Sequence, residues 1–341
     1  MPPPSIRSLA RQLGLSAATV SLALRESPRV VAATRQRVLQ AARRAGYRPN
    51  PLVGSVLTAV RRASHGGFQG VLMAINHWPG AGVPALHPFH REVLAGAKRR
   101  AAELGYSLTM TWEGPRHLSL SRLNAILAAR NINGVLVMPF RETRDFGALE
   151  WARLSGVVMD YCLGAPALHT VLPDHQSTLL AAMARLAARG YRRPGLIVAG
   201  WRDARVKHRW SGGFFSGCVA NYGALPVPEL ADPEHGRAAF LAWMRRHRPD
   251  VLIGHAQREV REWLGELDMK VPADVGFLAL NRTETVAPCA ALDLQPALLG
   301  AAAVESLVAQ LQRNERGVPA EPKTITISAR WIDGPTLRPA T

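Results

Sequence analysis

Arginine side chains crowd the N-terminal segment of this 341-residue chain, and binding to phosphate groups is the chemistry that they could do. Residues 1–62 carry eleven arginines against a single acid, Glu26, whereas the whole chain has 42 basic and 25 acidic side chains. A compact segment of this charge density is typical of proteins that bind nucleic-acid backbones. From the charge alone, two other interpretations stay open: an unstructured arginine-rich tail and a solvated basic face.

The side chains that enzymes use are scattered along the chain. His87 and His90 are three residues apart, but no cysteine or carboxylate accompanies them at a spacing that would complete a metal site. The sequence has neither a phosphate-binding glycine loop nor a nucleophile elbow. We therefore expect no catalytic residues, no metal and no cofactor, and we do not expect an enzyme.

The three cysteines, Cys162, Cys218 and Cys289, are far apart and odd in number, which argues against a disulfide framework. The N-terminal residues lack the apolar stretch of a secretion signal, and no apolar run is as long as a membrane-spanning helix. We expect a cytoplasmic protein that associates with the nucleoid.

Apolar periodicity predicts three short helices in the basic segment. Ser5 and Ser16 stand where N-caps of the first two helices would be, and Gly14 follows the first apolar stripe as a stop. The stripes of the three predicted helices consist of Ile6, Leu9, Ala10 and Leu13, then Val20, Ala23 and Leu24, then Val38, Leu39, Ala42 and Ala45. Two short helices joined by a tight turn, with a third helix that closes the core, are typical of a helix-turn-helix unit.

The same segment resembles the DNA-binding domain of LacI-type bacterial transcriptional regulators. The resemblance is carried in order by Leu13-Gly14-Leu15-Ser16, Thr19-Val20-Ser21, Val31…Thr34-Arg35…Val38 and Gly46-Tyr47-Arg48-Pro49-Asn50. It implies that the second helix enters the major groove, with Ala17, Ala18 and Leu22 facing base edges by van der Waals contact alone. The implied DNA-binding residues are Ser5, Ser16, Ala17, Ala18, Thr19, Ser21, Leu22, Arg25, Thr34, Tyr47 and Asn50. Packing in the core is the alternative for Tyr47, and helix propensity is the alternative for the two alanines.

After Asn50, the resemblance implies a hinge helix that pushes an apolar wedge into the minor groove and kinks the duplex. The wedge position falls on Val56, with Leu57 directly after it, and the sequence leaves open which of the two serves. A plain interdomain linker is the alternative for this segment. The expected domains are residues 1–50 for DNA binding, 51–65 for the hinge, and 66–333 for effector binding and dimerisation.

From about Gly70 onward, short continuous apolar runs alternate with helix-length segments, a pattern that predicts α/β structure with parallel sheets covered on both faces. The resemblance continues more weakly over residues 5–332 and implies a periplasmic-binding-protein-like domain of two doubly wound lobes. It places the division of the lobes near residue 175 and a return crossing near residue 295. Ligands of such folds bind beyond the carboxyl ends of the strands, in the cleft.

The cleft residues depart from the family pattern. Trp210 stands where relatives carry an arginine, His255-Ala256-Gln257 replaces an Asn-Asp pair, and Leu280-Asn281 replaces a Phe-Asp pair. The loss of two carboxylates argues against an ordinary pentose or hexose, and the basic stretch 202–209 could receive a sugar acid or phosphate, unless it is only a solvated loop. Trp201 and Trp210 could stack on a ring or belong to the core. The expected effector residues are His77, His87, Phe89, Phe140, Asp160, Trp201, Arg205, Arg209, Trp210, His255, Gln257 and Asn281.

These observations predict a DNA-binding transcriptional regulator, a repressor, that acts as a homodimer or tetramer on operator DNA and responds to a small-molecule effector. Two alternatives stay open: a cytosolic ligand-binding protein or enzyme with a vestigial basic head, and a constitutive DNA binder with an empty cleft. The sequence names neither the effector nor the operator.

Overall fold

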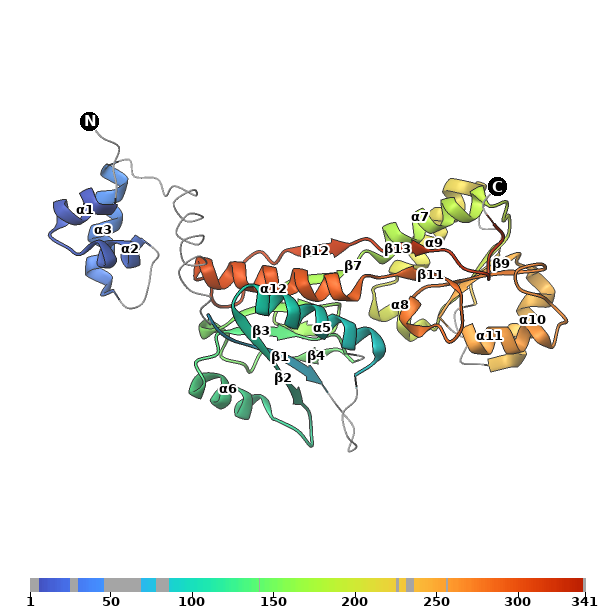
Figure 1. Ribbon diagram of the computed structural model, residues 1–341, viewed down its shortest axis with the longest axis horizontal. Helices are drawn as coiled ribbons and strands as arrows, with labels where there is room; N and C mark the ends of the chain where they lie inside the picture. Colours follow the sequence, from blue (N-terminus) through green and yellow to red (C-terminus); the bar gives the residue numbers. More distant parts are fainter. Residues whose placement is uncertain are drawn as a thin grey trace.

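The computed structural model describes residues 6–24, 30–45, 69–77, 86–140, 142–224, 227–230, 236–255 and 257–339. A separate three-helix unit begins the described chain, and two lobes follow it (Figure 1). The predicted fold class, a helix-turn-helix unit with a two-lobed α/β domain, is confirmed.

The three-helix unit consists of α1 (Ile6–Leu13), α2 (Ala17–Leu24) and α3 (Ala32–Arg44). Leu9, Val20 and Val38 are buried at its centre. Gly14 follows α1 with a φ of +64°, a left-handed conformation that glycine adopts without steric cost. The side-chain oxygen of Ser16 accepts a hydrogen bond from the backbone N–H of Thr19 at 3.0 Å, as expected for the N-cap of α2.

Lobe 1 is built on a six-stranded parallel sheet in the order β12-β7-β5-β3-β1-β2. Its strands are β1 (Gly70–His77), β2 (Tyr106–Glu113), β3 (Gly134–Val137), β5 (Ser155–Met159), β7 (His169–Pro173) and β12 (Thr324–Ile327). β1 pairs with both β2 and β3, with Leu72 opposite Leu108 on one side and Gly134 on the other. A short parallel pair, β4 (Arg144–Asp145) and β6 (Leu163–Ala165), forms a second sheet.

Helices cover both faces of the lobe 1 sheet. On one face lie α5 (Pro88–Glu103) and α12 (Pro296–Arg313), which run side by side in Figure 1, and on the other lie α6 (Leu120–Ala129) and η1 (Trp151–Arg153). Because both faces are covered, every residue of β3 and β5 is buried.

Lobe 2 contains a five-stranded sheet in the order β13-β11-β10-β9-β8. The strands β8 (Pro194–Ile197), β9 (Val251–Gly254), β10 (Gly276–Ala279) and β11 (Ala290–Asp293) are parallel, and β13 (Arg330–Ile332) runs antiparallel to β11, an exception to the predicted parallel sheets. The helices are α7 (His175–Ala188), α8 (Gly200–Arg205), α9 (Arg209–Tyr222), α10 (Gly236–His247), α11 (Gln257–Gly265) and the short η3 (Arg282–Glu284). The pair α7 and α9 packs on one face of the sheet, and α10 and α11 pack on the other.

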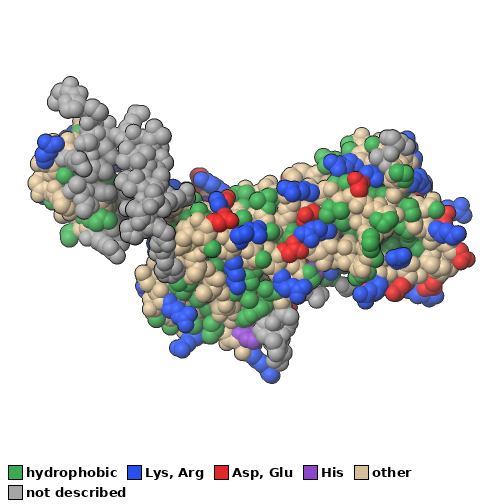
Figure 2. All heavy atoms as spheres, viewed as in Figure 1, with side chains coloured by type: hydrophobic (Ala, Val, Ile, Leu, Met, Phe, Trp, Pro, Cys, Tyr) green, Lys and Arg blue, Asp and Glu red, His purple; other side chains and the backbone are tan. Residues whose placement is uncertain are grey.

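The chain crosses between the lobes three times: at Asp174 between β7 and α7, at Leu294–Gln295 between β11 and α12, and at Ser328–Ala329 between β12 and β13. The first two crossings lie where the resemblance placed them, and the third was not predicted. Figure 2 shows arginine and lysine side chains spread over the visible face of both lobes, with acids among them. No helix within the described ranges is both long and apolar enough to cross a membrane.

Candidate functional site

A cavity of about 250 Å³ lies between the lobes, at the carboxyl ends of strands from both sheets. Lobe 1 contributes the start of α5 and the residues that follow β3 and β5, and lobe 2 contributes α8 and the starts of α7 and α9. The lining residues are His87, Phe89, His90, Phe140, Asp160, Pro173, His175, Trp201, Arg202, Arg205, Val206, Trp210, His255, Asn281, Glu284 and Leu294. Its position is the one where doubly wound folds bind ligands.

Aromatic rings form much of the cavity wall. The ring of Trp210 meets the ring of His175 edge-on at 4.6 Å between centroids, and His255 contacts Trp210 at 6.2 Å. Trp210 is almost fully buried, so it belongs to the core and lines the cavity at the same time. The guanidinium of Arg202 lies 5.0 Å from the ring of Trp201. A planar or ring-shaped ligand would find stacking partners here.

The charged side chains of the cavity are paired with one another. The guanidinium of Arg205 in lobe 2 donates a hydrogen bond to the carboxylate of Asp160 in lobe 1, and the guanidinium of Arg202 lies 3.1 Å from the carboxylate of Glu284. Burial opposes the ionisation of Asp160, but the charge and the hydrogen bond of Arg205, together with the backbone N–H of Tyr161, lower the pKa of Asp160. Burial likewise opposes the ionisation of Glu284, yet His255 and Arg202 lower its pKa to about 2. Both carboxylates are therefore ionised near neutral pH, each beside a cation.

Two histidines of the cavity are neutral. Burial, with a contribution from His87, lowers the pKa of His90 to about 4. Burial also lowers the pKa of His175 to about 4, and its Nδ1 atom is buried without a hydrogen-bond partner. A neutral imidazole offers one donor and one acceptor, so these rings suit hydroxyl or amide groups of a ligand.

Asp203 fixes the position of Trp210. Its buried carboxylate accepts hydrogen bonds from the backbone N–H groups of Trp210 at 3.0 Å and Ser211 at 3.4 Å, and it lies 3.2 Å from His208 Nδ1. These N–H groups belong to the first turn of α9, where a helix needs acceptors. No pattern in the sequence connects Asp203 with Trp210, because the two are joined only through the cap of α9.

Replacing this cap is expected to weaken lobe 2. Asp203→Ala leaves buried N–H groups without an acceptor and should lower the free energy of unfolding by about 1–2 kcal/mol, measured by urea denaturation. Tryptophan emission should shift to the red as Trp210 loosens. Asp203→Asn keeps an oxygen acceptor and should lose clearly less, and equal losses in the two variants would contradict the capping role.

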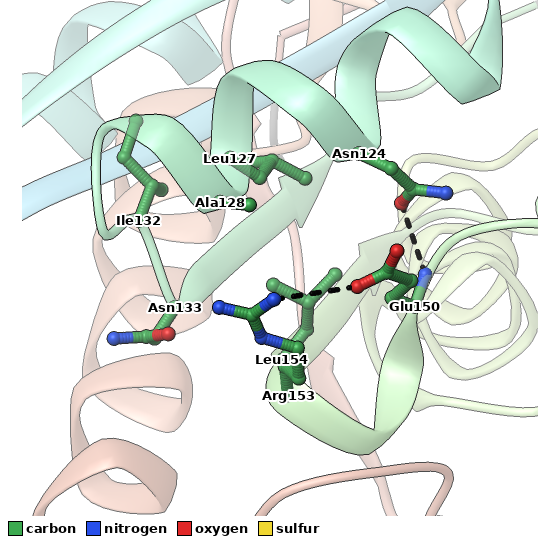
Figure 3. Close-up of a pocket in the computed structure, with 8 residues that line it drawn as sticks. All are labelled: Asn124, Leu127, Ala128, Ile132, Asn133, Glu150, Arg153 and Leu154. Carbon is green, nitrogen blue, oxygen red and sulfur yellow. Dashed lines mark hydrogen bonds and ion pairs between the residues drawn. The ribbon is translucent and has the colours of Figure 1, made fainter.

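A second, much smaller hollow of about 10 Å³ lies away from the cleft, between α6 and η1 (Figure 3). Glu150 bridges its rim, because its backbone N–H donates to Asn124 Oδ1 at 3.0 Å and its carboxylate lies 3.5 Å from Arg153. These polar groups already have partners, so the hollow offers little to a ligand.

The three-helix unit presents α2 to solvent. The Ser16 and Thr19 hydroxyls are hydrogen-bonded to each other at 2.8 Å, Leu22 is exposed, and Thr34 of α3 is half-buried. Ala17, Ala18 and Ser21 occupy α2, and their side chains lie outside what the structure describes. The remaining predicted DNA-binding residues also lie outside the described ranges: Ser5, Arg25, Tyr47, Asn50, Val56 and Leu57.

Comparison with known proteins places this architecture in a family. Residues 5–50 match the family model described as bacterial regulatory proteins, lacI family, and residues 183–337 match the periplasmic binding protein-like domain. The first segment corresponds to the three-helix unit, and the second covers most of lobe 2 together with α12 and β12 of lobe 1. Residues 5–50 therefore form a lacI-family domain.

The relatives of this chain are named as transcriptional regulators. The HTH-type transcriptional regulator AglR of Rhizobium meliloti is 34% identical over 41% of this chain and 36% of AglR. This chain spans only about a third to a half of the length of the curated relatives that it matches. Among solved structures, the regulator CelR in complex with cellobiose has a TM-score of 0.60 at 20% identity, covering 98% of this chain and 99% of CelR. The Lac repressor dimer bound to operator and the anti-inducer ONPF has a TM-score of 0.57 at 18% identity, with the same coverage of both chains.

The structure brings most of the predicted effector residues together. Those that line the cavity are His87, Phe89, Phe140, Asp160, Trp201, Arg205, Trp210, His255 and Asn281. Three do not line it. His77 is buried behind Phe140, with its Nδ1 2.6 Å from Glu113, and Gln257 is buried and accepts hydrogen bonds from the backbone N–H groups of Val286 and Ala287. Arg209 lies over the ring of Tyr161 instead.

Several cavity residues were not anticipated. Arg202 lies within the stretch 202–209, which the sequence singled out only for its charge, and His90 was considered only as a metal ligand; Pro173, His175, Val206, Glu284 and Leu294 carried no signal. Arg202 and Arg205 each have a carboxylate partner, and Lys207 lies 5.0 Å from the ring of Tyr161. The excess of positive charge that the stretch 202–209 suggests is therefore largely compensated in the folded protein. No group of three potential metal ligands occurs in the part of the chain that the structure describes.

Proposed function

We propose that this protein is a sequence-specific DNA-binding transcriptional regulator, a repressor and not an enzyme, whose affinity for operator DNA responds to a small molecule in the interlobe cavity. The observation that carries the proposal is the combination, in one chain with a lacI-family domain, of an exposed α2 on a basic three-helix unit and a cavity between two hinged lobes. The operator-bound Lac repressor dimer and the cellobiose complex of CelR, which share the fold, support both halves of it. Such a regulator acts at the chromosome, in the cytoplasm.

The mechanism is thermodynamic linkage. A ligand that binds one arrangement of the lobes more tightly than another shifts their populations, and it shifts operator affinity by the same differential free energy. In a homodimer, the lobes set the spacing of two DNA-binding units, so that a pseudo-palindromic operator is read one half-site per protomer. Thr19, Ser21, Thr34, Tyr47 and Asn50 would then position the phosphates, and Val56 or Leu57 would enter the minor groove.

The cavity favours as effector an uncharged ring with polar groups, and not the sugar acid or phosphate that the basic stretch 202–209 suggested. Its cations are already paired with carboxylates, so an added phosphate or carboxylate would have to displace Asp160 or Glu284. His90 and His175 remain to exchange hydrogen bonds with hydroxyl groups. Thermal shifts across a panel of metabolites identify the ligand, because a bound ligand raises stability in proportion to RT ln(1 + [L]/Kd). A panel without any shift would favour the constitutive DNA binder.

Leu22→Arg is expected to change the preferred operator sequence while leaving the fold intact. Leu22 is exposed on α2, and arginine at a base edge selects guanine with a discrimination of about 1–3 kcal/mol at one position of each half-site. In vitro selection of random duplexes with the wild type and the variant measures the change.

The two selections should converge on related inverted repeats that differ at the same position in each half. An identical consensus would contradict α2 as the reading helix. Failure of the wild type to enrich any duplex at moderate salt would contradict the proposed function, and a shallow dependence of affinity on salt would argue against several phosphate contacts per protomer.

A further inference from the structure

Within the described ranges, two ion pairs join the lobes across the cleft. The inner bridge, Asp160–Arg205, lies in the cavity. The outer bridge, Glu92–Arg282, connects α5 of lobe 1 with η3 of lobe 2, and neither of its residues lines the cavity. Both bridges need the lobes close together, because each joins residues on opposite sides of the three crossings.

The outer bridge is a bidentate ion pair whose arginine is held in place by a second carboxylate. Both terminal nitrogens of Arg282 donate to the Glu92 carboxylate, Nη1 to Oε1 at 3.2 Å and Nη2 to Oε2. The third guanidinium nitrogen, Nε, lies 2.9 Å from Asp293 of lobe 2. Asp293 is the last residue of β11, immediately before a crossing. Asp293 therefore holds the guanidinium of Arg282 in the orientation that it needs to bind the carboxylate of Glu92. Because the guanidinium is already oriented, less conformational entropy is lost when the bridge forms.

We propose that the outer bridge is a latch that favours the closed arrangement of the lobes before any ligand binds. Its consequence for regulation rests on the proposed function. The latch sets the fraction of ligand-free molecules that are already closed, and therefore how far an effector can still shift the equilibrium between open and closed lobes. Because Glu92 lies outside the cavity, the latch can be released without altering the residues that would contact the ligand.

The latch is tested by measuring the distance between the lobes in the ligand-free, full-length protein. Nitroxide labels on Ser121→Cys in α6 and Ala242→Cys in α10 report it by pulsed electron resonance, since both positions are exposed and the three native cysteines are buried. Glu92→Gln should raise the ratio of open to closed molecules about two- to fivefold, the range for a partly exposed ion pair. Glu92→Lys should raise it further, because it places two cations together.

Glu103→Gln is the matched control. Glu103 lies on the same helix and loses the same charge, but its partner, Arg100, belongs to the same lobe. The distance distribution of this variant should equal that of the wild type. Equal distributions for Glu92→Gln and the wild type, or an equal shift in the control, would overturn the latch. Operator binding is measured separately, so a shifted distance without any operator binding would refute the proposed function and leave the latch standing.

Discussion

Gly96→Ala is expected to lower the free energy of unfolding by about 3 kcal/mol, because α5 and α12 meet backbone to backbone at this residue. A Cβ atom at Gly96 would lie 2.0 Å from the carbonyl oxygen of Ala297, and one at Gly300 would lie 2.0 Å from the carbonyl oxygen of Val93. Neither neighbour is a flexible side chain, so the helices would have to separate. Urea denaturation of the full-length protein measures the loss.

Gly212→Ala is the control for this prediction. Gly212 lies inside α9, and a Cβ atom there would have no neighbour within 4 Å. Since alanine is the better helix former, this variant should gain about 0.5–1 kcal/mol. A neutral Gly96→Ala would show that α5 and α12 can move apart at no cost, and would contradict the close contact. Because His87, Phe89 and His90 begin α5, a displaced helix should also disturb the cavity.

Val20→Asp is expected to abolish specific DNA binding, with a loss of affinity on the order of 10³-fold, while both lobes stay folded. Val20 is fully buried between the three N-terminal helices, and a carboxylate without a partner at this position would unfold a unit this small. Operator titration measures the loss, and calorimetry of the same sample follows the melting of the lobes.

Val31→Asp carries the same chemical change to an exposed site. Val31 is the N-cap of α3 and makes no side-chain capping bond, so aspartate there should preserve the unit or stabilise it by about 1 kcal/mol. Its added negative charge matches that of Val20→Asp. If the two variants lost operator affinity equally, charge rather than folding of the unit would explain the effect. If Val20→Asp still bound operator specifically, the three-helix unit would not be the DNA-binding part.

Local patterns in the sequence were sufficient to predict the three-helix unit. Ser16 caps α2 and Gly14 adopts a positive φ because both requirements are met within one or two turns of chain. For the same reason α2 (Ala17–Leu24) begins directly after the predicted N-cap and ends at Leu24, the last residue of the predicted stripe. The parallel sheets followed from continuous apolar strands, because strands covered on both faces carry no alternation. β12 and β13 are among the strands that escaped prediction, since β12 is an exposed edge strand and both are short.

The cavity shows how far the sequence by itself determines this protein. Residue types and the family resemblance were enough to select nine of its lining residues, since strand ends and helix starts can be located along the chain. Which charges are paired was decided only by the tertiary structure: Asp160 meets Arg205, and Glu92 meets Arg282, across 45 and 190 residues of sequence. Ion pairing depends on distance in space, and the two lobes are brought together by three separate crossings. The sequence thus determined the elements and the family, and the packing of the lobes determined the electrostatics of the cleft.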